Sequence, residues 1–195
     1  AEQMGSGGKA WIFTSATLGE DDSLRWFTEQ AGLEGARTLR VGSPFDYAAH
    51  ARLYIPAGFP KPNEGAHPAA VATLASRFAR TLGGRTFVLT TTLRALQAIA
   101  EKLRAEFEAA GDAIRVLQQG ELPKRQLMQL FLAEPRSVLV GSQSFWEGID
   151  VPGDALQCVL IDKLPFPPPN DPLVEARVRQ IEERGGQAFT EFFVA

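Results

Sequence analysis

Hydrophobic and polar residues follow two different patterns along the middle and end of the chain. These patterns alternate, and they predict strands and helices in turn. Short apolar runs without alternation predict central strands at 85–91, 137–143 and 156–162, and a further strand is predicted at 114–119. Apolar residues spaced by three and four predict amphipathic helices at 67–82, 92–110, 122–133 and 173–184. Strands that alternate with helices are typical of βαβ units. We therefore predict an α/β fold with a mostly parallel sheet covered by helices on both faces.

The first part of the chain has a weaker pattern. It predicts short strands at 9–15, 38–44 and 51–56 and a helix at 20–32 with acidic residues in its first turn. Prolines predict loops at 58–65 and 166–172. Residues 1–9 are expected to be a linker or a cloning scar. Their glycines resemble a phosphate-binding loop only superficially, because they precede a strand instead of following one and lack the required spacing.

Composition and charge restrict the class of protein. In a chain of 195 residues, 45% are hydrophobic and 22% charged, as in an ordinary globular domain with a sizeable core. The net charge of −3 means that any binding to nucleic acid must depend on local groups. The single cysteine, Cys158, excludes a disulfide framework and an iron–sulfur cluster held by this chain alone, which needs about four thiolates. We expect a cytoplasmic protein without a membrane partner, since no apolar run approaches the roughly 18 residues of a membrane span.

Candidate chemistry is expected where the predicted strands end, because ligands of open α/β sheets bind at the carboxyl ends of the strands. Three hydroxyl residues, Thr90, Thr91 and Thr92, lie between a strand and a helix. A helix N-cap explains one of them. The free amides of a helix N-terminus also suit a phosphate, and contacts to a DNA backbone use such hydroxyls and amides without reading its sequence.

The run at 141–153, Gly-Ser-Gln-Ser-Phe-Trp-Glu-Gly-Ile-Asp-Val-Pro-Gly, is the most informative. Two aromatic residues, Phe145 and Trp146, precede two carboxylates, Glu147 and Asp150. An aromatic residue here can stack on a base or belong to the core, and the sequence leaves both interpretations open. Asp150 can accept hydrogen bonds from ribose hydroxyls or orient an arginine. A metal site is not expected, because no histidine or third acid is near.

Another hydroxyl-rich run, Thr-Ser-Ala-Thr-Leu at 14–18, ends the first predicted strand. A turn capped by a hydroxyl explains it by itself. The alternative is a small loop that senses a phosphate or a neighbouring domain.

Four segments occur in order: TSATL, FVLTTTLRAL, GSQSFWEGIDVPGDAL and VLIDKLPFPPPNDP. Together they resemble the second RecA-like domain of the DinG/YoaA helicases, which belong to the XPD-like group of superfamily 2. The first three resemble the family's motifs III, IV and V. The resemblance implies that 1–195 is a RecA-like three-layer α/β/α domain with a mostly parallel sheet.

The resemblance also implies an activity and a set of site residues. The whole protein would be an ATP-dependent 5′-to-3′ helicase that translocates on single-stranded DNA and unwinds duplex or forked DNA in repair or replication. Residues of motif III would couple the nucleotide state to DNA: Ser15, Ala16 and Thr17. Residues of motifs IV and V would contact DNA: Thr90, Thr91, Thr92, Ser142, Gln143, Phe145 and Trp146. The end of motif V would face the nucleotide: Glu147, Gly148 and Asp150.

Parts of the family pattern are absent from this chain. A phosphate-binding loop and an Asp-Glu-x-His box belong to the family's first RecA-like domain, which would be the partner that holds most of ATP and Mg²⁺. An iron–sulfur cluster would also lie in that missing part. Motif VI, which supplies an arginine finger, would follow residue 195. We therefore expect a fragment that covers motifs III to V and is inactive alone. The alternative is a non-catalytic α/β module that binds a protein partner or a small ligand.

Overall fold

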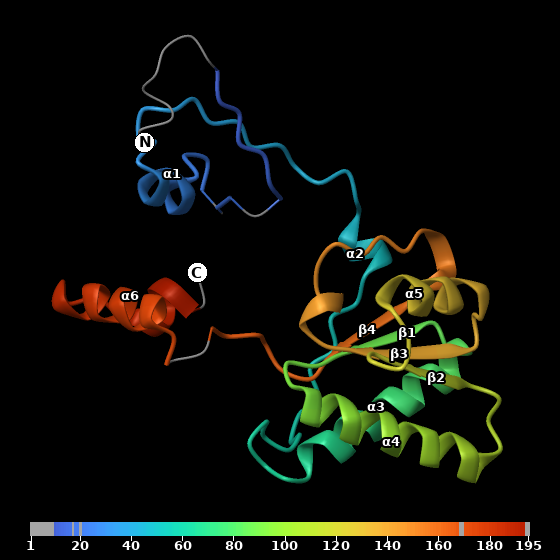
Figure 1. Cartoon of the computed structure of the whole chain (residues 1–195). Coiled ribbons are helices and arrows are strands. Elements are labelled where there is room, and N and C mark those ends of the chain that lie inside the picture. Colours follow the sequence, from blue (N-terminus) through green and yellow to red (C-terminus); the bar gives the residue numbers. More distant parts are fainter. Residues whose placement is uncertain (1–9, 17, 20, 168–169, 194–195) are drawn as a thin grey trace. The chain divides into compact units, whose positions relative to one another are not determined.

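A computed structural model describes residues 10–16, 18–19, 21–167 and 170–193. The chain forms two compact units, Ala1–Ile55 and Pro56–Ala195 (Figure 1). The predicted linker at 1–9 lies outside the described residues.

The second unit is built on a parallel sheet. Its strands are β1 (Thr86–Leu89), β2 (Arg115–Gln118), β3 (Ser137–Gly141) and β4 (Cys158–Ile161), in the order β2-β3-β1-β4. Every pair of neighbouring strands is parallel, and Leu89 at the end of β1 lies opposite Gly141 of β3 and Ile161 of β4. The four predicted strands and the parallel sheet are therefore confirmed, although each strand is shorter than predicted. The expectation that 156–162 is a central strand is wrong, because β4 lies at an edge of the sheet and Val159 and Ile161 are exposed.

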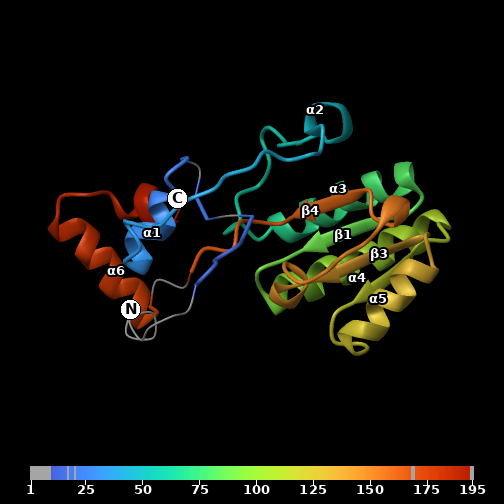
Figure 2. The same ribbon diagram turned by 90° about the horizontal axis from the view of Figure 1, so that it is seen from above.

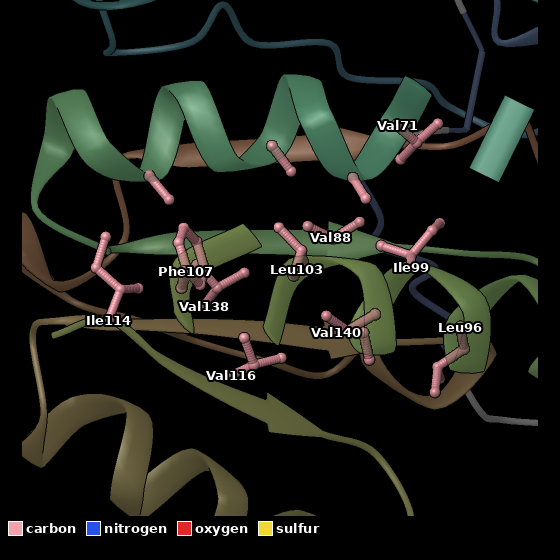
Figure 3. Packing of buried hydrophobic residues seen from close by; sticks show 14 of the residues in the cluster. Val71, Val88, Leu96, Ile99, Leu103, Phe107, Ile114, Val116, Val138 and Val140 are labelled. Carbon is pink, nitrogen blue, oxygen red and sulfur yellow. The ribbon is translucent and has the colours of Figure 1, made fainter. Parts of the chain in front are cut away.

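Helices cover both faces of this sheet. Helices α3 (His67–Leu82) and α4 (Leu93–Ala110) lie on one face, and α5 (Lys124–Ala133) lies on the other (Figures 1 and 2). The larger core lies between α3, α4 and the sheet, where Val88 of β1 packs with Ile99 and Leu103 of α4 (Figure 3). On the opposite face, the rings of Phe87 and Phe131 pack with their centroids 4.7 Å apart. This arrangement confirms the three-layer RecA-like α/β fold.

Local signals in the sequence fix several helix ends. Thr92 caps α4, since its hydroxyl accepts the amide of Ala95 at 3.2 Å. Helix α5 begins two residues later than predicted, after Pro123 in an extended conformation. Helix α6 (Pro172–Glu183) starts after Asp171, whose carboxylate accepts the amide of Leu173 at 2.8 Å. A short π-helical segment, η3 (Phe189–Phe193), follows.

The first unit departs from the prediction. Its helices are α1 (Arg25–Ala31) and α2 (Tyr47–His50), and the described residues of this unit contain no strand. The strands predicted at 9–15, 38–44 and 51–56 are therefore wrong for the part of the chain that is described. Their apolar side chains are exposed, by 85% in Ile12, 83% in Leu39 and 89% in Leu53. A segment forms a stable strand only beside a second strand that shares its hydrogen bonds. The described residues of this unit contain no such neighbouring strand.

The predicted helix at 20–32 is shortened for a local reason. Leu24 has a positive φ of 49°, a left-handed conformation that cannot continue into a right-handed helix. The carboxylate of Asp21 accepts a hydrogen bond from the backbone amide of Ser23 at 2.9 Å. This bond forms a turn before the helix begins. Asp21 and Asp22, which were expected in the first turn of the helix, therefore lie in the preceding turn, and Glu20 is outside the described residues.

Candidate functional site

Polar side chains follow all four strands at the carboxyl edge of the sheet. Gln119 follows β2, Ser142 follows β3, Thr90 follows β1 and Asp162 follows β4. Neighbouring strands of a sheet lie about 4.8 Å apart, so these residues form one continuous row. We refer to these four residues as the carboxyl-edge row. It lies where the sequence predicts ligand contacts.

The three predicted threonines have different environments. Thr90 is fully buried, and its hydroxyl lies 3.3 Å from the carbonyl of Gly141 and 3.2 Å from that of Thr92. The hydroxyl of Thr92 caps α4. By contrast, Thr91 Oγ1 is buried without a hydrogen-bond partner among the described residues. Of these three threonines, Thr91 therefore has the hydroxyl that makes no hydrogen bond within the described residues.

Ser142 is also buried, and its partner is a residue that the sequence analysis missed. The backbone amide of Ser142 donates to Gln119 Oε1 at 2.7 Å, and its hydroxyl lies 3.1 Å from the same oxygen. The adjacent Gln143 is exposed and begins a short 3-10 helix, η1 (Gln143–Phe145). Gln119 lies 23 residues before Ser142, so no local pattern links the two.

The two adjacent aromatic residues have separate roles. Phe145 is 3% exposed and belongs to the core on the α5 face. Its ring packs so closely on Gly141 that a Cβ added there would lie 2.8 Å from the ring. The core interpretation left open by the sequence therefore holds for Phe145 in this structure, and stacking on a base is not available to it. Trp146 is half-buried, and its indole N–H donates to the carbonyl of Thr90 at 3.2 Å.

Lys124, at the start of α5, holds the loop that follows β3. Its ammonium donates to the carbonyl of Ser144 and lies 5.5 Å from the centroid of the Phe145 ring, in cation–π geometry. It is also 3.5 Å from the carbonyl of Glu147. No local sequence pattern identifies this lysine, because its partners come from a loop 20 to 23 residues further on.

The three residues expected to face a nucleotide, Glu147, Gly148 and Asp150, are all exposed. Gly148 has a φ of 66°, which side-chain-bearing residues rarely adopt, and it lets the loop turn. A cavity of about 420 Å³ lies between this loop and α5, lined by Lys124, Arg125, Met128, Leu132, Gly148, Ile149 and Asp150. The structure thus brings Gly148 and Asp150 together with two cationic residues, whereas Glu147 does not line this cavity.

A second unpredicted feature lies at the β4 end of the row. Asp162 is 7% exposed, and neither of its carboxylate oxygens has a hydrogen-bond partner within the described chain. Burial raises the pKa of this carboxyl, and the nearby Lys163 and His67 side chains oppose the rise. The ring of His67 is buried, with Nδ1 2.8 Å from the carbonyl of Pro60 and Nε2 3.1 Å from that of Asp162.

The predicted coupling residues belong to the first unit. Ser15 and Ala16 are exposed in an irregular segment, and Thr17 lies outside the described residues. Among the residues described, no group of three or more His, Cys, Asp or Glu side chains is placed to hold a metal ion. No helix in the described part of the chain is both long and apolar enough to span a membrane.

Comparison with protein families gives a match over more than half of the chain. Residues 75–195 match the family described as the helicase C-terminal domain. The matched residues include all four strands, the carboxyl-edge row and the loop after β3.

Individual relatives are similar over nearly the whole chain. The chain is 41% identical to the ATP-dependent DNA helicase YoaA of Escherichia coli over 93% of its own length and 28% of that protein. It is 38% identical to the ATP-dependent helicase DinG of Mycobacterium tuberculosis over 91% of its length and 27% of that protein. The 3′-5′ exonuclease DinG of Bacillus subtilis is 30% identical over 97% of the chain and 21% of that protein.

The chain therefore spans about a quarter of the length of these relatives. The family match covers the sheet and its carboxyl edge, and the relatives carry the names that the four sequence segments predict. The chain belongs to the helicase C-terminal domain family and is a C-terminal helicase domain of the DinG/YoaA type.

Proposed function

We propose that this chain is the second motor domain of an ATP-dependent DNA helicase that moves 5′ to 3′ on single-stranded DNA and unwinds duplex or forked DNA during repair or replication. The observation that carries the proposal is the carboxyl-edge row, together with the unpaired hydroxyl of Thr91 beside it. Hydroxyls and amides at strand ends bind a phosphate backbone without reading bases. A motor that translocates along any sequence requires contacts of this kind.

In the proposed function, the two halves of the loop after β3 contact different ligands. Its first residues, Ser142 and Gln143, follow the sheet edge and face DNA in this proposal. Trp146 joins this loop to the end of β1 through Thr90, so a shift of one segment is transmitted to the other. Gly148 and Asp150 form the nucleotide side. Ser15, Ala16 and Thr17 would couple the two ligands.

The described residues fit one side of a nucleotide site. The cavity beside Asp150 contains cationic side chains from α5 and an exposed carboxylate, which suit phosphate or ribose groups. A phosphate-binding loop and a carboxylate cluster for Mg²⁺ are not found among the residues described. We propose that the first RecA-like domain holds most of ATP and Mg²⁺, and that any iron–sulfur cluster also lies outside this chain. When bound, ATP supplies the free energy of translocation. The residues here orient it and respond to its state.

We also propose that the protein is cytoplasmic. The single thiol, Cys158, is half-buried and free, as expected in a reducing cytoplasm. Single-stranded DNA and the first RecA-like domain are the proposed partners.

The test uses the full-length protein that carries this chain. ATP hydrolysis is measured with and without single-stranded DNA, and unwinding is measured on duplexes with either a 5′ or a 3′ single-stranded tail. We expect hydrolysis that rises with single-stranded DNA and unwinding only from the 5′ tail. Unwinding only from the 3′ tail would refute the polarity. Lack of any DNA-stimulated hydrolysis would favour the non-catalytic module instead.

A further inference from the structure

Gln119 is one of the two members of the carboxyl-edge row, with Asp162, to which the resemblance assigns no role. It directly follows β2, its side chain is half-buried, and its backbone amide donates to the carbonyl of Val140 at 3.0 Å. Its side-chain oxygen accepts two donors from one residue, the amide and the hydroxyl of Ser142. Gln119 therefore holds the start of the loop after β3.

These contacts settle which way the Gln119 amide points. The backbone N–H of Ser142 can only donate, so the atom 2.7 Å from it must be the side-chain oxygen and not the nitrogen. The nitrogen, Nε2, consequently points away from Ser142. No acceptor for Nε2 is found among the residues that the structure describes. Gln119 thus presents two unused N–H donors at the sheet edge.

The same contacts change what Ser142 offers to a ligand. While its hydroxyl donates to Gln119, it has no hydrogen left to give to a phosphate oxygen. The donor presented at this point of the row is therefore the Gln119 amide. A phosphate oxygen accepts hydrogen bonds and donates none, so an N–H donor is the complementary group.

The space beside Gln119 is open. Gly120 has a φ of 101°, which strains any residue with a side chain, and a Cβ added there would meet no atom within 4 Å. A glycine that is required by conformation and has open space above it lets another backbone approach closely. A strand of DNA crossing the row would reach Gln119 next after Ser142, because β2 and β3 are neighbours.

We propose that Gln119 is a DNA-backbone contact of this domain, in which Nε2 donates to a phosphate oxygen while Oε1 positions Ser142. This inference rests on the proposed function and extends the row of phosphate contacts to β2. The contact carries no charge, so it adds affinity without adding to the salt dependence of binding.

The test compares two isosteric substitutions in the full-length protein. Gln119→Glu keeps an oxygen for the amide of Ser142 but replaces the N–H donors with a charged oxygen that repels phosphate. Gln157→Glu is the matched control: it introduces the same charge at an exposed position before β4, at the opposite edge of the sheet. Fluorescence anisotropy with a labelled single-stranded oligonucleotide gives Kd at several salt concentrations, and thermal unfolding checks the fold.

We expect Gln119→Glu to weaken DNA binding about tenfold, the loss of one hydrogen bond to a charged group, and Gln157→Glu to change it little. The defect of Gln119→Glu should shrink as salt rises, since salt screens the repulsion. A purely structural role would instead lower the melting temperature and give a defect independent of salt. Equal Kd values for the two variants would overturn the inference and leave the proposed function intact. Failure of the unmodified protein to bind DNA would overturn the proposed function itself.

If Gln119→Glu unfolds, Gln119→Met provides a second route. It removes both the acceptor and the donors without adding charge. We expect weaker DNA binding with an unchanged slope of log Kd against log salt. The slope depends on the number of phosphates neutralised by cationic side chains, and this substitution removes no such side chain. An unchanged Kd for this variant would also overturn the inference.

Discussion

The indole N–H of Trp146 donates a hydrogen bond to the main-chain carbonyl of Thr90, 3.2 Å away, and so ties the loop after β3 to the end of β1. The two residues are 56 positions apart in the chain. The bond joins the segments that resemble motifs IV and V. It also explains why one of two adjacent aromatic residues is only half-buried, since an indole needs an acceptor for its N–H.

Replacing Trp146 by phenylalanine should destabilise the second unit by about 0.5–1.5 kcal/mol, the contribution of one hydrogen bond. The carbonyl of Thr90 would lose this partner, while most of the apolar contact would remain. Urea denaturation followed by circular dichroism measures the change. Trp26→Phe in α1 is the control, because the Trp26 side chain is about half exposed and belongs to the first unit. Equal effects of the two substitutions would contradict the role of the bond.

Gly141→Ala should destabilise the same unit by about 1–3 kcal/mol through overpacking. The added methyl group would lie 2.8 Å from the ring of Phe145, which is held in the core and cannot retreat without moving the loop. Thermal unfolding measures the loss. Gly65→Ala is the control, since a Cβ at Gly65 meets nothing within 4 Å.

A double substitution tests the cause. Phe145→Leu makes room beside residue 141, so Gly141→Ala should cost less in that background than in the unmodified protein. Additive losses would show that the ring of Phe145 is not the source of the strain.

The two sides of the loop after β3 should be separable in the full-length helicase. Asp150→Ala should slow ATP turnover several-fold and leave the Kd for single-stranded DNA nearly unchanged, because Asp150 is exposed in the cavity beside α5. Ser142→Ala should weaken DNA binding by about fivefold, equivalent to one hydrogen bond of about 1 kcal/mol. The effect would be indirect: Ser142→Ala removes the hydroxyl that donates to Gln119 Oε1, so Gln119 is then held by the backbone amide of Ser142 alone.

Steady-state ATPase assays and DNA anisotropy on the same preparations distinguish these outcomes. Ser144→Ala is the control for Ser142→Ala, since Ser144 is exposed and contributes its main-chain carbonyl, not its hydroxyl, to Lys124. Matching defects in Asp150→Ala and Ser142→Ala would refute the division of the loop.

Strands β1 and β3 could be predicted from the sequence because burial on both faces produces apolar runs that are visible locally. Strand β4 has a similar run, although Val159 and Ile161 are exposed at the edge of the sheet. The capping role of Thr92 is also visible locally, since it depends on a residue three positions away. The strands predicted at 38–44 and 51–56 are wrong because β-forming residues in a short segment do not show whether a partner strand lies beside it.

The site was predictable only in part for a related reason. Phe145 and Trp146 are adjacent and equally aromatic, so the sequence could not decide which enters the core. Gly141 determines that Phe145 enters the core, because the absence of a side chain at Gly141 leaves room for the Phe145 ring. Gln119 and Asp162 were missed because their importance depends on neighbouring strands, which the order β2-β3-β1-β4 brings together from distant parts of the sequence.

Asp162 should make the stability of the second unit depend on pH. Burial raises the pKa of its carboxyl above the ordinary value of 3.8, so the folded state favours the protonated form. The stability associated with that form is fully present below the unfolded-state pKa and is lost as pH rises through the folded-state pKa. Neither oxygen of this buried carboxyl has a hydrogen-bond partner among the described residues, so its ionisation lowers the stability of the folded state.

Asp162→Asn should consequently raise the melting temperature by a few degrees at neutral pH, because the neutral amide avoids the cost of burying a charge. The gain should diminish as the pH falls through the raised pKa of Asp162, because the unmodified carboxyl then becomes protonated too. Thermal unfolding between about pH 4 and pH 8 measures both effects. The exposed Asp154→Asn is the control, with no expected gain at any pH in this range. A lower melting temperature for Asp162→Asn at neutral pH would mean that the carboxylate has a cationic partner in the folded protein, and that its charge stabilises this edge of the sheet.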